Sequence, residues 1–183
     1  MQSITNVINI KSEILFREAE DCFLYFNQIK KAVKKLDEAI ELTPNHHKSL
    51  ALKGDILYVK GKINEALDVY TQANKFSKND SKILGSMAIC LEAKEEYEKA
   101  MYYCDKAFFF INENNCQILQ SLYELKISIL LKLKEYEKAE KMFSEAKYNL
   151  SVDEIVSLKS HKEVINLKLR IREKLKTSNL QVL

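Results

Sequence analysis

The segment that decides the fold is Ala66–Ala73, which reads ALDVYTQA. A larger apolar residue follows the first alanine by four positions, and a second alanine follows it by seven. The same spacing occurs in Ala32–Ala39 (AVKKLDEA), Ala100–Ala107 (AMYYCDKA) and Ala139–Ala146 (AEKMFSEA). These segments begin 34, 34 and 39 residues apart. A period of this size indicates a repeat array, in which each unit buries its apolar face by stacking on its neighbours.

The composition favours helices throughout the chain. Of the 183 residues, 46% are hydrophobic and 30% are charged, whereas three are glycine and one is proline. Strand-rich folds need many turns that use glycine and proline, so we expect an all-α protein with short connections. Apolar residues at helical spacing predict two antiparallel helices in each repeat. In the second repeat these run from about Lys48 to Lys60 and from Ile63 to Ala73, on either side of Gly61.

The repeats divide the chain into three parts. We expect an N-terminal helix or extension over residues 1–12, a repeat array over residues 13–151, and one or two C-terminal capping helices with a frayed end over residues 152–183. The four helix pairs are expected at residues 13–46, 47–80, 81–114 and 120–151. The longer last period is assigned to a loop between residues 111 and 120, which is rich in asparagine.

Together these features resemble the tetratricopeptide-repeat family. The resemblance rests on the 34-residue period, the paired alanines of each second helix, Gly54 in a first helix, the EYEKA segments at Glu96–Ala100 and Glu135–Ala139, and Pro44 after the first repeat. It covers residues 13 to 151. It implies a right-handed α-solenoid in which the first helix of each pair lines the concave side.

Two positions depart from the pattern of that family. Where its members have a small residue early in the first helix, Gly54 and Ala88 comply, but the first and last repeats have Glu20 and Ile127. We expect a charged or bulky side chain at this position to widen the gap between the two helices of those repeats.

No motif for catalysis, phosphate binding or metal binding occurs in the sequence. The cysteines and histidines lack the spacing of a zinc site; they are Cys22, Cys90, Cys104, Cys116, His46, His47 and His161. We therefore expect no enzymatic activity, no cofactor and no metal. Free thiols, the lack of a long apolar run and the lack of a secretory signal together predict a cytoplasmic protein without a membrane span.

The net charge of +3 lies entirely in the C-terminal part, where residues 151–183 carry seven basic and four acidic side chains. Such a basic helix can bind nucleic acid or an acidic membrane surface. However, acidic residues interrupt it, and no aromatic residue that could stack on bases follows Tyr148. We keep nucleic-acid binding as a lesser hypothesis.

The concave surface is the expected partner-binding site. Residues at i, i+4, i+7 and i+11 of each first helix, counted from one position before its core stripe, share this face. Tyr58 is adjacent, and Arg17 corresponds to a position used by family members that hold the acidic C-terminal tails of heat-shock chaperones. The resulting site residues are Arg17, Asp21, Tyr25, Lys48, Leu52, Asp55, Tyr58, Val59, Lys82, Ser86, Ile89, Leu125 and Ser128.

These side chains argue against a carboxylate clamp, because Asp21 would repel a carboxylate and Leu52 cannot donate a hydrogen bond. Leu52, Val59, Ile89 and Leu125 instead indicate a groove that is largely apolar. Such a groove suits an amphipathic or extended apolar segment of another protein.

The sequence therefore predicts a non-catalytic adaptor whose concave groove binds a peptide or helix of a partner protein. A bacterial secretion-type chaperone that holds an apolar cargo segment is the alternative of similar size and repeat number. A terminal helix of the same chain in the groove, or a homodimer, remains open as well.

Overall fold

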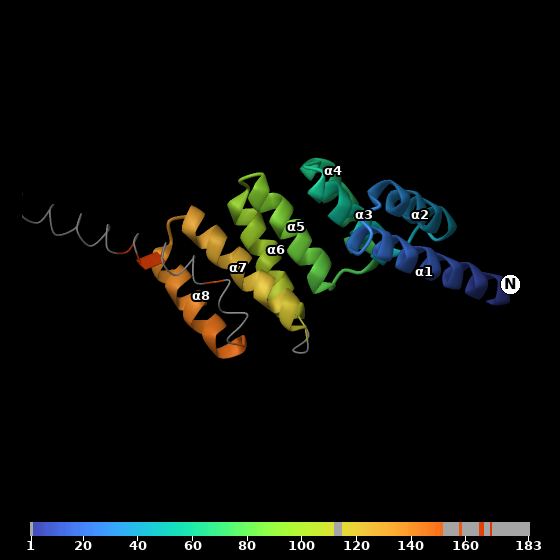
Figure 1. The fold of residues 1–183 in the computed structure, drawn as a ribbon. Coiled ribbons are helices and arrows are strands. Elements are labelled where there is room, and N and C mark those ends of the chain that lie inside the picture. The colour runs from blue at the N-terminus through green and yellow to red at the C-terminus, as the bar shows by residue number, and fades with distance from the viewer. Residues whose placement is uncertain (1, 112–114, 152–157, 159–164, 167–168, 170–183) are drawn as a thin grey trace, which may run out of the picture.

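The computed structural model describes residues 2–111, 115–151, 158, 165–166 and 169. Within this part the chain forms eight α-helices and no β-strand, and the helices follow one another along an elongated array (Figure 1). The helices are α1 (Gln2–Leu24), α2 (Ile29–Leu42), α3 (His47–Val59), α4 (Ile63–Phe76), α5 (Ser81–Ala93), α6 (Tyr97–Phe110), α7 (Cys116–Lys132) and α8 (Tyr136–Asn149). The prediction of an all-α helical-repeat solenoid is confirmed.

Two boundaries differ from the sequence analysis. The expected separate extension over residues 1–12 is part of α1, which begins at Gln2. The first helix of the fourth unit begins at Cys116 rather than at residue 120, so part of the extra length of this repeat extends α7. The asparagine-rich residues 112–114 lie outside the described part.

Each second helix packs on its first helix through the predicted alanines, all eight of which have no exposed surface. In the second unit the ring of Tyr70 covers Gly54, and a Cβ atom built on Gly54 would lie 2.6 Å from Cε1 of that ring. The Tyr70 hydroxyl donates a hydrogen bond to Oδ1 of Asp55 at 2.6 Å. Glycine is therefore required where α3 meets the tyrosine ring of α4.

The turn inside each unit contains one residue with left-handed backbone geometry. Asn27, Gly61, Glu95 and Lys134 each precede the first buried alanine by five positions and have φ angles of 50°, 74°, 62° and 61°. Glycine adopts this conformation without steric cost, whereas glutamate and lysine do not. The two later turns thus retain a local strain that Gly61 avoids.

The first turn is one residue longer than the other three, because residues 25–28 separate α1 from α2 whereas three residues separate the helices of each later unit. The extra residue shifts α1 by one position relative to its partner. As a result, Leu15, Ala19 and Cys22 face the core, and Ala19 has no exposed surface. Ala19 takes the small-residue position that the sequence analysis gave to Glu20, so the widening expected from Glu20 is wrong.

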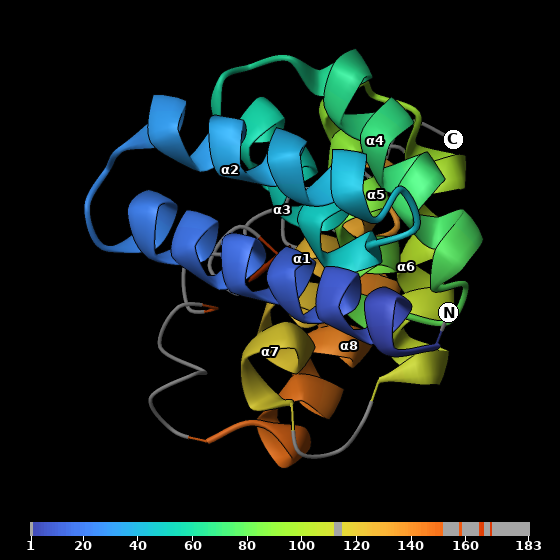
Figure 2. The same ribbon diagram turned by 90° about the vertical axis from the view of Figure 1, so that its right-hand side faces the viewer.

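The array bends with the first helices on its inner side. Among the described residues, α1 contacts α3, α3 contacts α5 and α5 contacts α7, but no second helix contacts the second helix of the next unit. Figure 2 shows the array from its N-terminal end, with α1 and α2 in front. Closer spacing on one side of a stack produces curvature, so the first helices form the inner, concave face.

Two residues of the C-terminal part pack against the last unit of the array. Leu158 and Ile165 are fully buried and belong to one cluster with Ile127 and Phe143. Such contacts are what the predicted capping segment requires. The rest of that segment lies outside the described residues, so its extent stays a prediction.

His46 caps α3 and joins it to α1. Its Nδ1 accepts a hydrogen bond from the Ser49 amide at 3.3 Å, and its Nε2 lies 3.2 Å from Oε2 of Glu13. Because an accepting nitrogen carries no proton, this arrangement requires the neutral ring with its proton on Nε2. Burial lowers the pKa of His46 below its usual value, although the neighbouring Glu13 carboxylate acts in the opposite direction.

We predict that Lys134→Gly stabilises the protein. Left-handed geometry costs an L-residue about 1–2 kcal/mol, and the greater chain entropy of glycine offsets about 0.5–1 kcal/mol of the gain. The free energy of unfolding in urea should therefore rise by up to about 1 kcal/mol, and Glu95→Gly should act in the same way. Lys132→Gly, which lies within α7, is the control and should lower stability. A loss of stability in Lys134→Gly would contradict this account of the turn.

We also predict that stability falls as pH drops through the range in which His46 becomes protonated. The pKa of His46 is lower in the folded than in the unfolded chain, so the unfolded chain binds more protons and acidification favours it. Loss of the cap should cost about 1 kcal/mol between roughly pH 7 and pH 5. Thermal unfolding of His46→Asn, which retains a capping side chain, should lose this dependence, whereas His47→Asn should keep it. Equal pH dependence in both variants would refute the role of His46.

Candidate functional site

The concave face carries two neighbouring depressions, and both are lined by first helices. The larger lies between α5 and α7 and has a volume of about 290 Å³. The smaller lies where α1, α3 and α5 meet and has a volume of about 80 Å³. Lys82 lines both of them, so they adjoin along the inner side of the array, and together they are called the groove.

The larger depression has an apolar floor and a rim of small, mostly uncharged polar groups. The floor is formed by Ile89, Ile118, Leu122 and Leu125. The rim contains Ser81, Lys82, Ser86, Gln117 and Ser121. Gly85 lies beside the floor, and a Cβ atom there would approach Leu122 Cδ2 to 3.2 Å. Small side chains on α5 thus leave the space, and leucines of α7 close its base.

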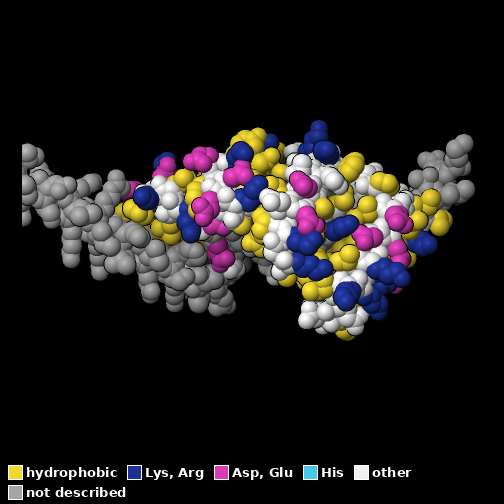
Figure 3. Space-filling view, turned by 90° about the horizontal axis from the view of Figure 1, so that it is seen from above, with side chains coloured by type: hydrophobic (Ala, Val, Ile, Leu, Met, Phe, Trp, Pro, Cys, Tyr) yellow, Lys and Arg dark blue, Asp and Glu magenta, His cyan; other side chains and the backbone are white. Residues whose placement is uncertain are grey.

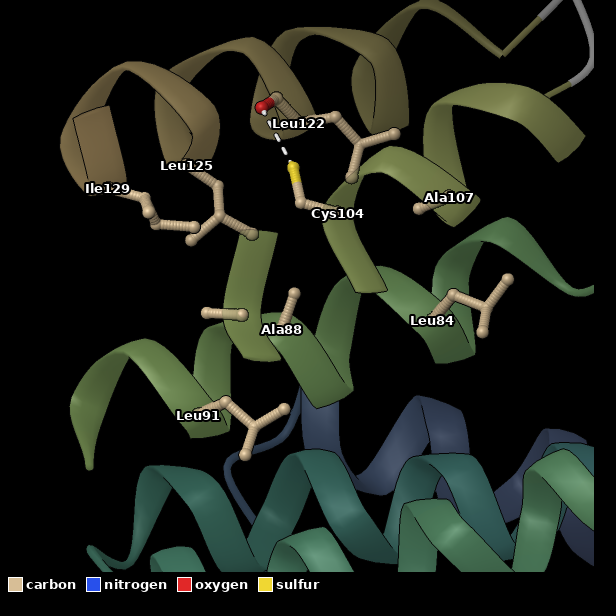
Figure 4. Close-up of a cluster of buried hydrophobic side chains, with 9 residues drawn as sticks. Leu84, Ala88, Leu91, Cys104, Ala107, Leu122, Leu125 and Ile129 are labelled. Atoms are coloured by element: carbon tan, nitrogen blue, oxygen red, sulfur yellow. Dashed lines mark hydrogen bonds between the residues drawn. The ribbon is translucent and has the colours of Figure 1, made fainter. Parts of the chain in front are cut away.

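The floor of this depression is also part of the core. Figure 4 shows Leu122 and Leu125 of α7 beside Cys104 of α6, whose thiol donates a hydrogen bond to the Leu122 carbonyl at 3.8 Å. Leu122 and Leu125 are 2% and 8% exposed. Burial raises the pKa of Cys104 to about 12, so the thiol stays protonated and is not a nucleophile. The floor is therefore held in place by close packing rather than by the contents of the groove.

The smaller depression is more polar. Phe16, Ala51, Leu52 and Ile83 supply its apolar surface. Its charged and ionisable groups are Glu20, His47, Lys48, Asp80 and Lys82. The carboxylate of Asp80 accepts hydrogen bonds from the amides of Lys82 and Ile83 and so caps α5.

The lysines of the groove are paired with carboxylates of the same chain. The Lys48 Nζ atom lies 3.1 Å from Oε1 of Glu13, and the Lys82 Nζ atom lies 3.4 Å from Oδ2 of Asp55. Asp55 also accepts a hydrogen bond from the Tyr70 hydroxyl. Elsewhere on the surface, the view in Figure 3 shows acidic and basic side chains interleaved. A groove whose lysines are already paired does not offer the free cations that a carboxylate clamp needs.

Six of the predicted site residues line the two depressions: Lys48, Leu52, Lys82, Ser86, Ile89 and Leu125. Leu52 is only 4% exposed, because it packs with residues of α1 and α2 in the core. A charge introduced at Leu52 would therefore damage the fold before it tested the groove.

Four more predicted residues lie on α3 and α7 next to the groove. Asp55 is held by Tyr70 and Lys82, and the Ser128 hydroxyl donates to Glu92 of α5 at 2.9 Å. Burial raises the pKa of the half-buried Tyr58. Val59, at the end of α3, is 64% exposed.

The three residues predicted on α1 do not line the two depressions. Arg17 pairs with Glu13, Asp21 borders a separate depression between α1 and α2, and Tyr25 lies in the turn. The one-residue shift of α1 explains Asp21, since Glu20 takes the groove position instead and lines the smaller depression together with Phe16. The apolar stripe of Leu15, Ala19 and Cys22 is the sequence signal that could have revealed this register.

The described residues offer neither a metal-binding cluster nor a membrane-spanning helix. Among the described residues, no group of three or more histidine, cysteine, aspartate or glutamate side chains could hold a metal ion. In the same part, no helix is long and apolar enough to cross a membrane. The basic stretch considered for nucleic acid, residues 159–176, lies almost wholly outside the described part and stays a prediction.

Comparison with solved structures supports the fold. A structure of MamA, residues 41 to the end, from Desulfovibrio magneticus RS-1 aligns with a TM-score of 0.64 and 17% identity, and covers 75% of each chain. A tetratricopeptide-repeat protein from Parabacteroides merdae ATCC 43184 gives a TM-score of 0.63 and 22% identity over 89% of this chain and 67% of that one. At these identities the likeness shows the fold alone.

Comparison with curated proteins and families identifies the repeats. The BBSome complex member BBS4 from Bos taurus is 26% identical over 98 residues, which are 54% of this chain and 19% of that protein. This chain thus corresponds to about a fifth of the relative's length. The family described as Psidin, N-terminal TPR repeats region, matches residues 23–149, more than half of the chain. The chain belongs to this family of tetratricopeptide-repeat proteins.

Proposed function

We propose that this protein is a non-catalytic adaptor that binds a segment of a partner protein in the groove along α1, α3, α5 and α7. The observation that carries the proposal is the depression between α5 and α7, with its apolar floor and its polar rim, in which Lys82 is the charged residue. Its size and lining suit one or two apolar side chains of a peptide or helix. A cytoplasmic location is part of the same proposal.

The groove is well suited to binding because it is preformed. Leu122 and Leu125 keep their positions through contacts with the core, so little of the protein needs to become ordered when a partner arrives. The cost of ordering then falls mainly on the partner segment. Binding to such a surface resembles the insertion of an amphipathic segment into a fixed apolar groove.

The rim defines the chemistry of the partner segment. The Ser121 hydroxyl donates to the Gln117 carbonyl at 3.0 Å and retains lone pairs that can accept a hydrogen bond from a ligand. Ser86 and the Gln117 side chain add further donors and acceptors at the rim. We therefore propose an apolar anchor side chain flanked by backbone or uncharged polar groups.

The comparisons support an interaction role in general terms. The chain belongs to a tetratricopeptide-repeat family, and one relative is described as a member of a complex. A secretion-type chaperone would use the same groove, and its cargo would have the same apolar anchor. The general adaptor role is therefore the one that we propose.

Filling the larger depression should weaken partner binding. We predict that Ser121→Trp, which places an indole over the floor, weakens binding about tenfold or more, because the anchor loses its place. Peptides selected from a displayed random library against the wild type supply the ligands, and fluorescence anisotropy of labelled copies measures their affinity.

Ser144→Trp is the matched control, because Ser144 is likewise exposed and likewise donates to the carbonyl four residues earlier, at 3.0 Å, but lies on α8. It should leave the affinity unchanged. If both variants bind the selected peptides as the wild type does, the groove between α5 and α7 is not the binding site.

The affinity of the groove should depend only weakly on salt. Lys48 and Lys82 are paired within the protein, so few ions are released when a partner binds. Between about 50 and 200 mM salt we expect a change of roughly threefold or less, whereas binding through several phosphate contacts would change by orders of magnitude. A steep loss in the same anisotropy titration would favour the basic C-terminal stretch.

A further inference from the structure

Of the five large aliphatic side chains that are exposed in the described part, four lie on α1. Val7, Ile10, Ile14 and Leu24 are 64%, 60%, 51% and 58% exposed. The first three follow one another at helical spacing and form one stripe. Single exposed apolar residues are common on proteins, but a contiguous apolar stripe indicates an interaction surface.

The stripe occupies a position that later units bury against the preceding unit. Ile14, Ile83 and Leu122 each precede the central small or apolar residue of their helix by five positions, which makes them equivalent. Ile83 and Leu122 are each 2% exposed, because α3–α4 and α5–α6 cover them, whereas Ile14 is 51% exposed. The N-terminal end of the array thus presents a stacking face for which the described residues supply no partner.

The same helix extends past its own partner. The hydroxyls of Ser12 and Thr43 are 2.7 Å apart, so the end of α2 lies opposite Ser12. The part of α1 before Ser12 projects beyond α2, as Figure 1 shows. Val7 and Ile10 lie on this projecting part and are exposed.

We propose that this stripe binds the same stripe of a second copy of the chain, with the two α1 helices antiparallel and Ile10 near the two-fold axis. Val7 of one copy then lies beside Ile14 of the other, so the apolar residues cover one another. A two-fold contact of this kind uses the same surface on both copies and closes on itself.

The charges of α1 fit a second copy. No charged residue occurs from Gln2 to Ile10. In the antiparallel arrangement, Lys11 and Glu13 of each copy face this uncharged part of the other, so no like charges meet. The surface can therefore meet a second copy of itself without like-charge repulsion, and its apolar residues cover one another.

The two ends of the array differ in a way that agrees with this arrangement. The C-terminal end has Leu158 and Ile165 buried over its last unit, whereas the N-terminal end leaves Ile10 and Ile14 exposed. If both ends were open, units would stack head to tail into filaments. Within the described residues the uncovered stacking face lies at the N-terminal end, which agrees with a contact that closes at two copies.

The test uses opposite charges at the axis. Sedimentation equilibrium should show a dimer for the wild type. Ile10→Lys and Ile10→Glu should each weaken dimerisation by about 100-fold or more, because two like charges meet across the axis. Mixing the two variants should restore a dimer that contains one copy of each. Circular dichroism checks that both variants remain helical.

Val59→Lys is the matched control, since Val59 is 64% exposed, close to the 60% of Ile10, but lies on α3. It should dimerise as the wild type does.

A wild-type chain that stays monomeric at the highest soluble concentration would overturn the proposal and leave the stripe to a different protein. A dimer that survives Ile10→Lys, or a mixture that fails to re-form, would exclude this two-fold contact. Peptide binding in the groove is measured separately and should be unaffected by Ile10→Lys.

Discussion

The structure depends on close approach between the two helices of each unit. Fully buried alanines on the second helix bring the backbones together, and in the second unit the Tyr70 ring leaves room for no side chain larger than that of Gly54. The tyrosine hydroxyl would be costly to bury alone, but Asp55 accepts its hydrogen bond. This contact fixes the angle and spacing of the pair. The stacking of units and the shape of the inner face are built on these closely packed pairs.

The bend of the array gives those pairs the concave face on which the candidate site lies. Each first helix contacts the first helix of the next unit, whereas the second helices do not contact one another. Side chains of α5 and α7 are therefore brought together across a narrow gap. Small residues on α5 keep that gap open, and Leu122 and Leu125 close its base. The site is thus made by neighbouring repeats, and no single repeat could form it alone. The proposed recognition of a partner therefore needs no unusual chemistry on the helix surfaces.

Much of this was predictable from the sequence, because alanine spacing reports directly on helix packing. The four pairs, their second helices and six groove residues follow from that spacing. The register of α1 did not follow from the alanine spacing, which favours Glu20. The longer turn and the apolar stripe through Ala19 are the signals that decide it. The burial of Leu52 was also missed, because one periodic pattern cannot separate the wall of a groove from the contact with the preceding unit.

The longer first turn has a broader consequence. One residue added to the turn between two helices rotates one helix about its axis by about 100° relative to the other, since an α-helix has 3.6 residues per turn. In this chain that rotation moved Phe16 and Glu20 into the groove and Asp21 out of it, while an alanine still filled the core. The length of a turn therefore decides which side chains face the groove, even when no residue of the helix is substituted. A lineage or a designer can give the same scaffold a new recognition face by inserting or deleting one residue, provided that a small side chain lies next to the old one.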